Sequence, residues 1–172
     1  DFYSNFEVAF VGREYQVLEN KNCLPRFSLI YDYTVVDSAG EVLNKILLPD
    51  FNPGNTAFLE EEAGISLSKD TGELDIIKNV SNEKVFDVKS GKSAFLIVRE
   101  NYHPDWKCYV DGKRQKIYRA DYIFYGVFVP EGEHKVRFVN ESGIFNIASL
   151  LSLIGFAAFL IALIFCFKDR RN

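Results

Sequence analysis

The pattern of apolar and polar residues in the first third of the chain predicts β-strands interrupted by one helix. The ranges Phe6–Val17 and Arg26–Val36 are rich in Val, Phe, Tyr and Ile and alternate partially, which is typical of strands with one buried face. A capping box that begins at Ser38 precedes an apolar helical face, and Pro49 supplies a stop. Because Thr56–Glu60 returns as a short strand, this part predicts a strand, helix, strand unit.

Beyond Glu62 the pattern becomes that of short antiparallel strands separated by turn residues. The strongest hairpin signal is Asp111-Gly112. The predicted strands are Gly64–Ser68, Glu73–Asn79, Lys84–Lys89, Ser93–Arg99, Trp106–Val110, Lys116–Arg119, Tyr122–Val129 and His134–Val139. Strands at this spacing indicate an antiparallel sandwich. The predicted fold class is therefore mainly β with one helix in the N-terminal half (α+β), arranged as an antiparallel β-sandwich.

The range Ile144–Phe167 contains 24 residues without a charge. As a helix this stretch is ~36 Å long, which exceeds the ~30 Å hydrocarbon core of a bilayer. We therefore predict a C-terminal transmembrane helix, rather than a buried helix of a globular core. Small residues gather on one side of it, which favours contact with other transmembrane helices of the same full-length protein. They are Ala148, Ser152, Gly155 and Ala162, with Ala158 nearby.

Charge counts predict which side of the membrane each part occupies. Residues 1–143 hold 17 basic and 23 acidic residues, a net charge of −6, whereas residues 168–172 hold three basic and one acidic residue. By the positive-inside rule the tail is cytoplasmic and the β region is extracytoplasmic. Because neither a signal peptide nor a methionine is present, we expect the chain to be a piece of a longer polypeptide with earlier membrane spans.

These patterns divide the chain into four predicted parts. The strand, helix, strand portion covers residues 1–62, and the antiparallel sandwich portion covers residues 63–143. The transmembrane helix covers residues 144–167, and the cytoplasmic tail covers residues 168–172. Since few residues separate the last strand from the helix, the sandwich is expected to lie close to the bilayer surface.

Composition excludes some classes of function. A hydrophobic share of 48% excludes a largely disordered chain, and a net charge of −4 argues against a nucleic-acid partner. Cys23 and Cys108 can form a disulfide in an oxidising compartment, but two buried free thiols are the favoured interpretation, and Cys166 lies in the predicted span. No Cys or His pair has zinc spacing, so neither a metal nor a cofactor is predicted.

The densest group of chemically active residues joins two predicted strands. Tyr102, His103, Asp105 and Trp106 combine rings, an imidazole and a carboxylate, a mixture that sugar-binding surfaces use. They are candidate ligand-binding residues. For Trp106, a place in the sandwich core is favoured and a ligand platform is the alternative. His103 is the better of the two histidines as an acid or base, yet no nucleophile accompanies it, so no catalytic residue is predicted.

Two further candidates join predicted strands near the end of the domain. Arg119 and Asp121 are two residues apart, and in an extended chain such side chains point to the same side. This arrangement suits a structural ion pair, which is favoured, or a grip on an anionic or hydroxylated ligand. His134 shares a strand face with Val136 and Phe138, which indicates a structural or surface role.

The chain resembles the C-terminal region of the bacterial YfhO family of multi-pass membrane proteins. The resemblance rests on Glu100–Gly112, Ile117–Tyr122 and Val127–His134, and it extends upstream to Leu24-Pro25-Arg26 and Asp50–Pro53. The typical family form here is a Tyr-x-Pro-Gly-Trp-x-x-x-Val-Asp-Gly segment, an Arg-Ala-Asn-Tyr segment and a Val-Pro-x-Gly-x-His turn before the last membrane helix. This chain departs from it at three positions, with Asp105 for Gly, Asp121 for Asn and Tyr125 for a common Arg.

The resemblance implies a role in the cell envelope. Members are similar to membrane glycosyltransferases that use polyprenyl-phosphate-linked sugars, and some are associated with glycosylating polymers such as lipoteichoic acid. The catalytic acid of such enzymes belongs to an early extracytoplasmic loop that this chain lacks, so the resemblance implies a non-catalytic terminal part. The expected partners are the lipid bilayer and an envelope glycan or lipid-linked sugar. A membrane-anchored carbohydrate- or protein-binding scaffold is the alternative function.

Overall fold

The structure is a computed structural model that describes residues 6–141 and 143–169, with side chains described over 6–141 and 148–161. The strands are β1 (Phe6–Val11), β2 (Gln16–Asn20), β3 (Phe27–Ile30), β4 (Asp32–Val35), β5 (Thr56–Leu59), β6 (Gly72–Val80), β7 (Glu83–Ser90), β8 (Ala94–Val98), β9 (Trp106–Val110), β10 (Lys113–Gln115), β11 (Tyr118–Ala120), β12 (Phe124–Val129) and β13 (Gly132–Asn140). The helices are α1 (Ala39–Ile46) and α2 (Gly143–Asp169). The β-rich fold class predicted from the sequence is confirmed.

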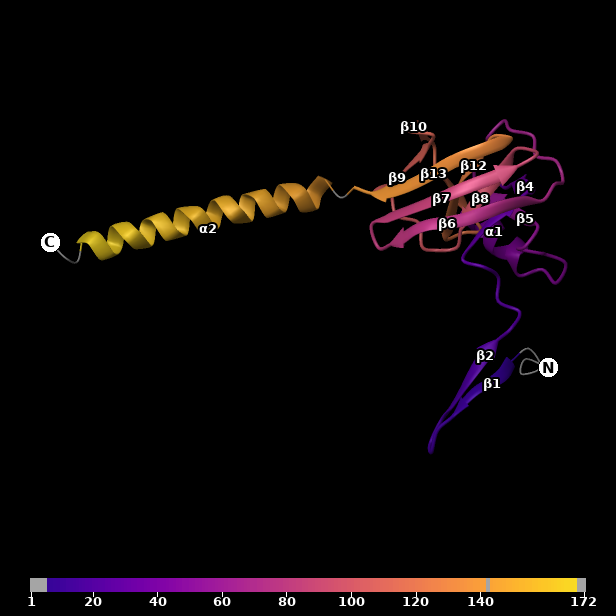
Figure 1. Cartoon of the computed structure of the whole chain (residues 1–172), viewed down its shortest axis with the longest axis horizontal. Helices are drawn as coiled ribbons and strands as arrows, with labels where there is room; N and C mark the ends of the chain where they lie inside the picture. The colour runs from indigo at the N-terminus through magenta and orange to yellow at the C-terminus, as the bar shows by residue number, and fades with distance from the viewer. Residues whose placement is uncertain (1–5, 142, 170–172) are drawn as a thin grey trace.

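Two sheets form the body of the domain (Figure 1). One has five strands in the order β10-β9-β13-β7-β6, and the other has six in the order β3-β8-β12-β11-β5-β4. Strand pairs are antiparallel throughout the described chain except β4 and β5, which are parallel. Parallel neighbours need a crossover, and α1 supplies it. The predicted strand, helix, strand unit is therefore formed.

The core lies between the two sheets because the strands of the five-stranded sheet alternate. In β7 the side chains of Phe86 and Val88 are buried, whereas those of Asp87 and Lys89 point outward. The core residues from both sheets are Phe27, Phe86, Val88, Leu96, Val98, Trp106, Cys108, Val110, Tyr125, Val127, Val129, Val136 and Phe138. Burying the inner faces of two sheets against each other is the main stabilisation of such a fold.

The six-stranded sheet is covered on its second face as well. Ile30, Leu59, Phe95 and Ile97 form an apolar cluster there, and side chains of the segment 63–67 pack against it. This explains why β8 is buried along its whole length, without alternation. The predicted strand Gly64–Ser68 forms no ladder, and its side chains Ile65 and Leu67 pack on this face instead.

Local signals explain the helix α1. Ser38 Oγ accepts a hydrogen bond from Glu41 N at 3.3 Å, and Glu41 Oε2 accepts one from Asp37 N at 3.2 Å. The first bond caps the N-terminus of the helix, and the second fixes the residue that precedes the cap. Val42 is fully buried and anchors the helix.

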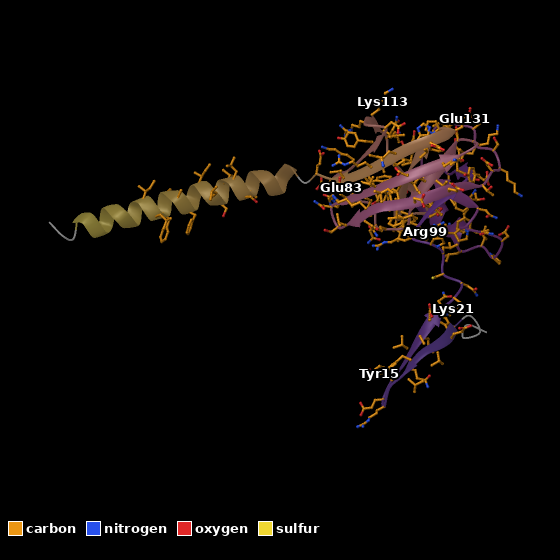
Figure 2. The ribbon with its side chains drawn as sticks, in the orientation of Figure 1. Tyr15, Lys21, Glu83, Arg99, Lys113 and Glu131 are labelled. Carbon is orange, nitrogen blue, oxygen red and sulfur yellow. The ribbon has the colours of Figure 1, made fainter. Side chains whose placement is uncertain are left out.

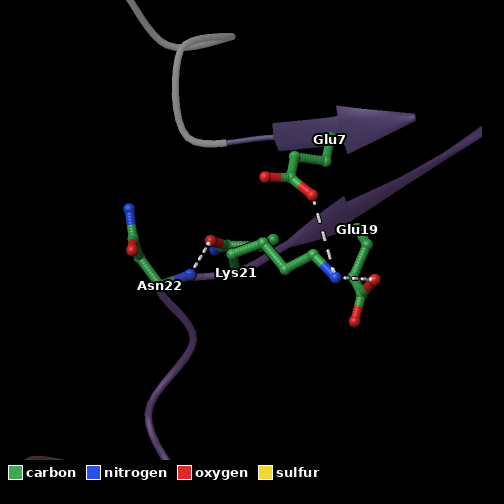
Figure 3. Close-up of polar contacts among 5 residues, drawn as sticks. Glu7, Glu19, Lys21 and Asn22 are labelled. Atoms are coloured by element: carbon green, nitrogen blue, oxygen red, sulfur yellow. Dashed lines mark hydrogen bonds and ion pairs between the residues drawn. The ribbon is translucent and has the colours of Figure 1, made fainter. Parts of the chain in front are cut away.

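The N-terminal region forms a hairpin rather than the single predicted strand at Phe6–Val17. β1 and β2 pair with each other and stand apart from both sheets (Figure 1). Lys21 Nζ lies 2.6 Å from Glu19 Oε2 and 3.9 Å from Glu7 Oε2, so it links the two strands where β2 ends (Figure 3).

Helix α2 follows β13 after residues 141 and 142 and extends away from the sheets (Figure 1). Among the fully described residues, none of the helices combines the length and apolar character needed to cross a bilayer. The side chains at both ends of the predicted span Ile144–Phe167 lie outside the described residues, as do residues 170–172 of the tail. The span and its orientation stay predictions.

Candidate functional site

The loop between β8 and β9 carries three of the candidate residues, and the fourth, Trp106, begins β9; the loop lies beside the start of α2. Trp106 is the register partner of Asn140 at the end of β13. Glu141 N donates a hydrogen bond to Asp105 O at 3.1 Å. The loop is therefore bonded directly to the residue that precedes α2 by two positions.

The second candidate segment, the turn between β11 and β12, lies against the same loop. Tyr102 N donates to Ile123 O at 2.8 Å, which joins the two segments. The fold thus brings together the backbones of two candidate segments separated in sequence. Their side chains do not all converge on one site.

Trp106 belongs to the core, because only 9% of its surface is exposed. Its indole stacks on the ring of Tyr125 with centroids 5.9 Å apart. Tyr125 is itself fully buried, so the position at which this chain departs from the family's Arg is also a core position. Little of the indole face is left for a ligand, and this favours the core interpretation.

A buried ionic cluster lies beneath the loop and was missed by the sequence analysis. Lys84 is 2% exposed, its Nζ lies 4.4 Å from the centroid of the Trp106 ring, and it pairs with Glu100 Oε2 at 3.0 Å. Glu100 Oε1 also lies 2.7 Å from Arg26 Nε. Lys84 is two residues from the buried Phe86 in the same strand, so the two side chains point to the same face. This spacing could have predicted from the sequence that Lys84 is buried. A charge on the inner face needs a partner, and Glu100 provides it.

Asp121 and Arg119 do not pair with each other; within the described chain, Arg119 meets Glu60 instead. Arg119 Nη2 also donates to Tyr122 O at 2.8 Å. Asp121 has a φ of +48° and Tyr122 a φ of +75°, so the chain is not extended there. The assumption behind the predicted ion pair is therefore wrong at this turn.

Asp121 fixes the turn to the neighbouring strand. It is 6% exposed, and its Oδ1 accepts a bond from Phe58 N at 2.8 Å while its own N donates to Phe58 O at 2.9 Å. Burial raises the pKa of the Asp121 carboxyl, and the Phe58 N–H and the charge of Arg99 oppose that rise. Its place in the fold is that of a turn-stabilising residue.

Arg99 anchors the segments around this turn. Its Nη1 donates to Pro25 O at 2.9 Å and to Ser28 Oγ at 2.7 Å, and its Nη2 donates to Pro53 O at 2.7 Å. These bonds tie the start of β3 and the loop before β5 to the end of β8. Arg99 therefore holds in place three segments that are distant in sequence.

The exposed candidates form the outer edge of the loop. His103 is 60% exposed, and its Nδ1 lies 3.7 Å from Asp105 Oδ2 and accepts a hydrogen bond from Asp105 N at 3.3 Å. Tyr102 is half-buried against the core. Such groups can form hydrogen bonds with hydroxyls of a ligand. Among the described residues no group of His, Cys, Asp and Glu is arranged to hold a metal ion.

The described cysteines are free, as favoured from the sequence, but only one is buried. Cys108 lies in the core and Cys23 is exposed, while the side chain of Cys166 lies outside the described residues. Burial raises the pKa of the Cys108 thiol, so it is unreactive. The prediction that both thiols are buried is wrong for Cys23, because the linker between β2 and β3 lies at the surface.

The fold defines a β-sandwich domain that leads into a C-terminal helix. Residues 68–152 match the model of a family described as bacterial membrane protein YfhO. The resemblance noted from the sequence is thereby confirmed: these residues match the YfhO family. The family description associates the chain with a bacterial membrane.

A curated relative gives the same family. The "Uncharacterized protein YfhO" of Bacillus subtilis (strain 168) is 27% identical over 73 residues, which is 42% of this chain. The matched stretch spans only 8% of the relative's length. No solved structure matches the chain.

Proposed function

We propose that the chain is the extracytoplasmic domain and the last membrane span of a YfhO-type membrane protein. In this proposal the domain assists the transfer of sugars from a polyprenyl-phosphate-linked donor to a cell-envelope polymer. The domain is not itself catalytic. It positions the donor or the acceptor at the membrane surface, with α2 across the bilayer and residues 168–172 in the cytoplasm.

The bond between the loop and the base of α2 carries the proposal. Asp105 O accepts from Glu141 N, so the loop cannot move far from the start of the helix. With α2 in the bilayer, the exposed His103 and the half-buried Asp105 lie close to the headgroups, where the sugar of a lipid-linked donor is held. Hydrogen-bonding groups at that level are suited to orienting its hydroxyls.

Kinetics of the full-length protein test this role. We expect His103→Ala with Asp105→Ala to raise KM for the lipid-linked donor about tenfold, the effect of losing one or two hydrogen bonds, without changing kcat. The matched control is Lys92→Ala with Glu131→Ala, which removes two exposed polar side chains from turns at the opposite end of the sandwich (Figure 2 labels Glu131). An unchanged KM for the loop variant removes the positioning role, and unchanged product after deletion of residues 1–143 removes any role of the domain.

A second function, a membrane-anchored binding scaffold, is favoured by a groove between the edge strands β3 and β6. The groove has a volume of about 910 Å³, with an apolar floor and a polar rim. Its floor includes Phe27, Leu29 and Leu74, and its rim includes Asp32 and Lys69. This combination is typical of sites that bind small molecules or peptide segments.

A groove-filling variant separates the two functions. We expect Thr71→Trp, at the rim, to weaken binding of a soluble, uncharged envelope oligosaccharide while sugar transfer in the full-length protein is unchanged. Transfer that falls together with binding would assign the groove to the first function. Binding that is equal to that of the wild type would exclude the groove as the scaffold's site.

A further inference from the structure

The outer face of the five-stranded sheet carries an uneven distribution of charge along its strands. The pairing registers align the side chains in rows across the sheet, and the first row is the one nearest α2. The first row is Val80, Glu83, Val139 and Lys107, and the second is Lys78, Val85, Arg137, Tyr109 and Arg114. The rows farther from α2 include Asp75, Asp87 and Lys135, then Glu73, Lys89 and Glu133.

The half of this face next to α2 has an excess of positive charge. We call its four cations the basic collar: Lys78, Lys107, Arg114 and Arg137. Two carboxylates, Glu83 and Glu141, accompany them, so this half has a formal net charge of +2. The far half has four carboxylates and two lysines, a formal net charge of −2, although residues 1–143 as a whole are acidic. The charge is therefore polarised along the direction in which β13 leads to α2.

The two carboxylates are shared among the cations. Lys107 Nζ lies 2.5 Å from Glu141 Oε2, Arg137 Nε lies 2.6 Å from Glu83 Oε1, and Lys78 also pairs with Glu83. The hydrogen bond from Lys107 lowers the pKa of Glu141, and the charges of Arg137 and Arg114 add to that effect. Because the four cations outnumber the two carboxylates, and each carboxylate is already in contact with a cation, part of the positive charge stays available to an external anion.

We propose that the basic collar contacts the phosphates of anionic lipid headgroups in the membrane that α2 enters. This inference rests on the proposed function, because it needs α2 in the bilayer. The two rows of the collar are about 7 Å apart along the strands, and the headgroup layer beyond the hydrocarbon is of similar thickness. Extended Lys and Arg side chains reach across such a layer. Repulsion of the acidic far half would hold the sandwich upright.

Chemical labelling of the full chain in lipid nanodiscs tests the proposal. We compare nanodiscs of phosphatidylglycerol with nanodiscs of phosphatidylcholine and measure the rate at which Lys107 reacts with a small amine reagent. The rate is expected to fall about fivefold in the anionic discs, the factor that corresponds to the attraction of one cation to an anionic surface. Lys89 and Lys135, on the far half, are expected to react at equal rates in both.

Matched variants assign the effect to the collar. Arg114→Gln with Arg137→Gln should bring the Lys107 rate in anionic discs close to the neutral value. Lys89→Gln with Lys135→Gln removes two charges from the same face and should leave the effect intact. Equal Lys107 rates in the two lipids, with α2 inserted, would overturn the collar proposal alone, whereas a chain that does not insert would overturn the membrane span as well.

A phosphate arm separates a lipid from a free anion. In phosphatidylcholine discs, inorganic phosphate is compared with chloride at equal ionic strength. Equal Lys107 rates support the lipid assignment. If phosphate alone slows Lys107 as much as phosphatidylglycerol does, the collar binds free phosphate and the lipid assignment is wrong.

Discussion

The buried cluster around Lys84 shows how one residue can determine the stability of the loop above it. Lys84 loses its hydration on folding, and Glu100 and the Trp106 ring replace it. Removing one member of a buried pair leaves the other uncompensated, which typically costs about 3–5 kcal/mol. The cluster therefore makes the loop position sensitive to Glu100, a residue that touches no predicted ligand.

We expect Glu100→Ala to lower the free energy of unfolding by about 3–4 kcal/mol, because Lys84 would remain buried without a carboxylate. The measurement is urea unfolding of the chain in detergent, followed by the fluorescence of its single Trp. Glu133→Ala is the control, since it breaks the exposed pair with Lys89 and should change stability by less than about 1 kcal/mol. Equal effects of the two variants would show that the buried pair does not stabilise the fold.

The pair formed by His134 and Asp111 makes the stability of the fold depend on pH. His134 Nδ1 lies 2.6 Å from Asp111 Oδ2, and this hydrogen bond raises the pKa of His134 and lowers that of Asp111. The His134 contribution to stability is complete below its ordinary pKa of about 6.5 and is lost as pH rises through its raised value. The Asp111 contribution is complete above about pH 3.9 and is lost as pH falls through its lowered value.

The pair is therefore expected to stabilise the fold most between about pH 4 and 6.5. The unfolding midpoint of Asp111→Asn, measured from about pH 4 to about pH 9, should fall below that of the wild type most strongly near pH 5.5 and approach it near pH 9. A difference between the two proteins that is independent of pH would show that the charge on His134 does not contribute.

At the scale of elements, β12 depends on a glycine. A Cβ added at Gly126 would lie 2.4 Å from Leu96 O and 2.6 Å from Phe95 Cζ, so the close approach of β12 to β8 excludes a larger residue. We expect Gly126→Ala to destabilise the chain by about 3 kcal/mol, the upper end of the usual cost of overpacking. Gly40→Ala in α1 meets only Ser38 Oγ at 4.0 Å and should be neutral or stabilise by up to about 1 kcal/mol. Urea unfolding measures both, and equal effects would contradict the packing argument.

Elements with local signals could be predicted from the sequence. The α1 capping box and the alternation in Trp106–Val110 depend on neighbours in sequence, and both were predicted correctly. The role of Gly64–Ser68 could not be predicted, because strand and extended cover have the same local pattern and differ only in long-range contacts. The turn at Asp121 could not be predicted for the same reason, because hydrogen bonds to Phe58 in another strand stabilise its positive φ.

At the scale of the whole molecule, the fold provides its own probe of topology. Cys23 is exposed in the linker before β3, whereas Cys108 is buried in the core of the same domain. A membrane-impermeant maleimide therefore distinguishes a domain outside the cell from one inside, and Cys108 controls for unfolding.

In intact cells that make the full-length protein, we expect the reagent to modify Cys23 and to leave Cys108 unmodified. Mass spectrometry of the short tryptic peptide after Lys21 detects the first, and Cys23→Ser should abolish that signal. Since the only barrier between reagent and exposed thiol is the membrane, modification of Cys23 only after lysis would place the sandwich in the cytosol. That outcome would reverse the orientation inferred from the charges that flank α2, and the lipid-linked sugar would then lie on the wrong side of the membrane for His103 and Asp105 to orient it.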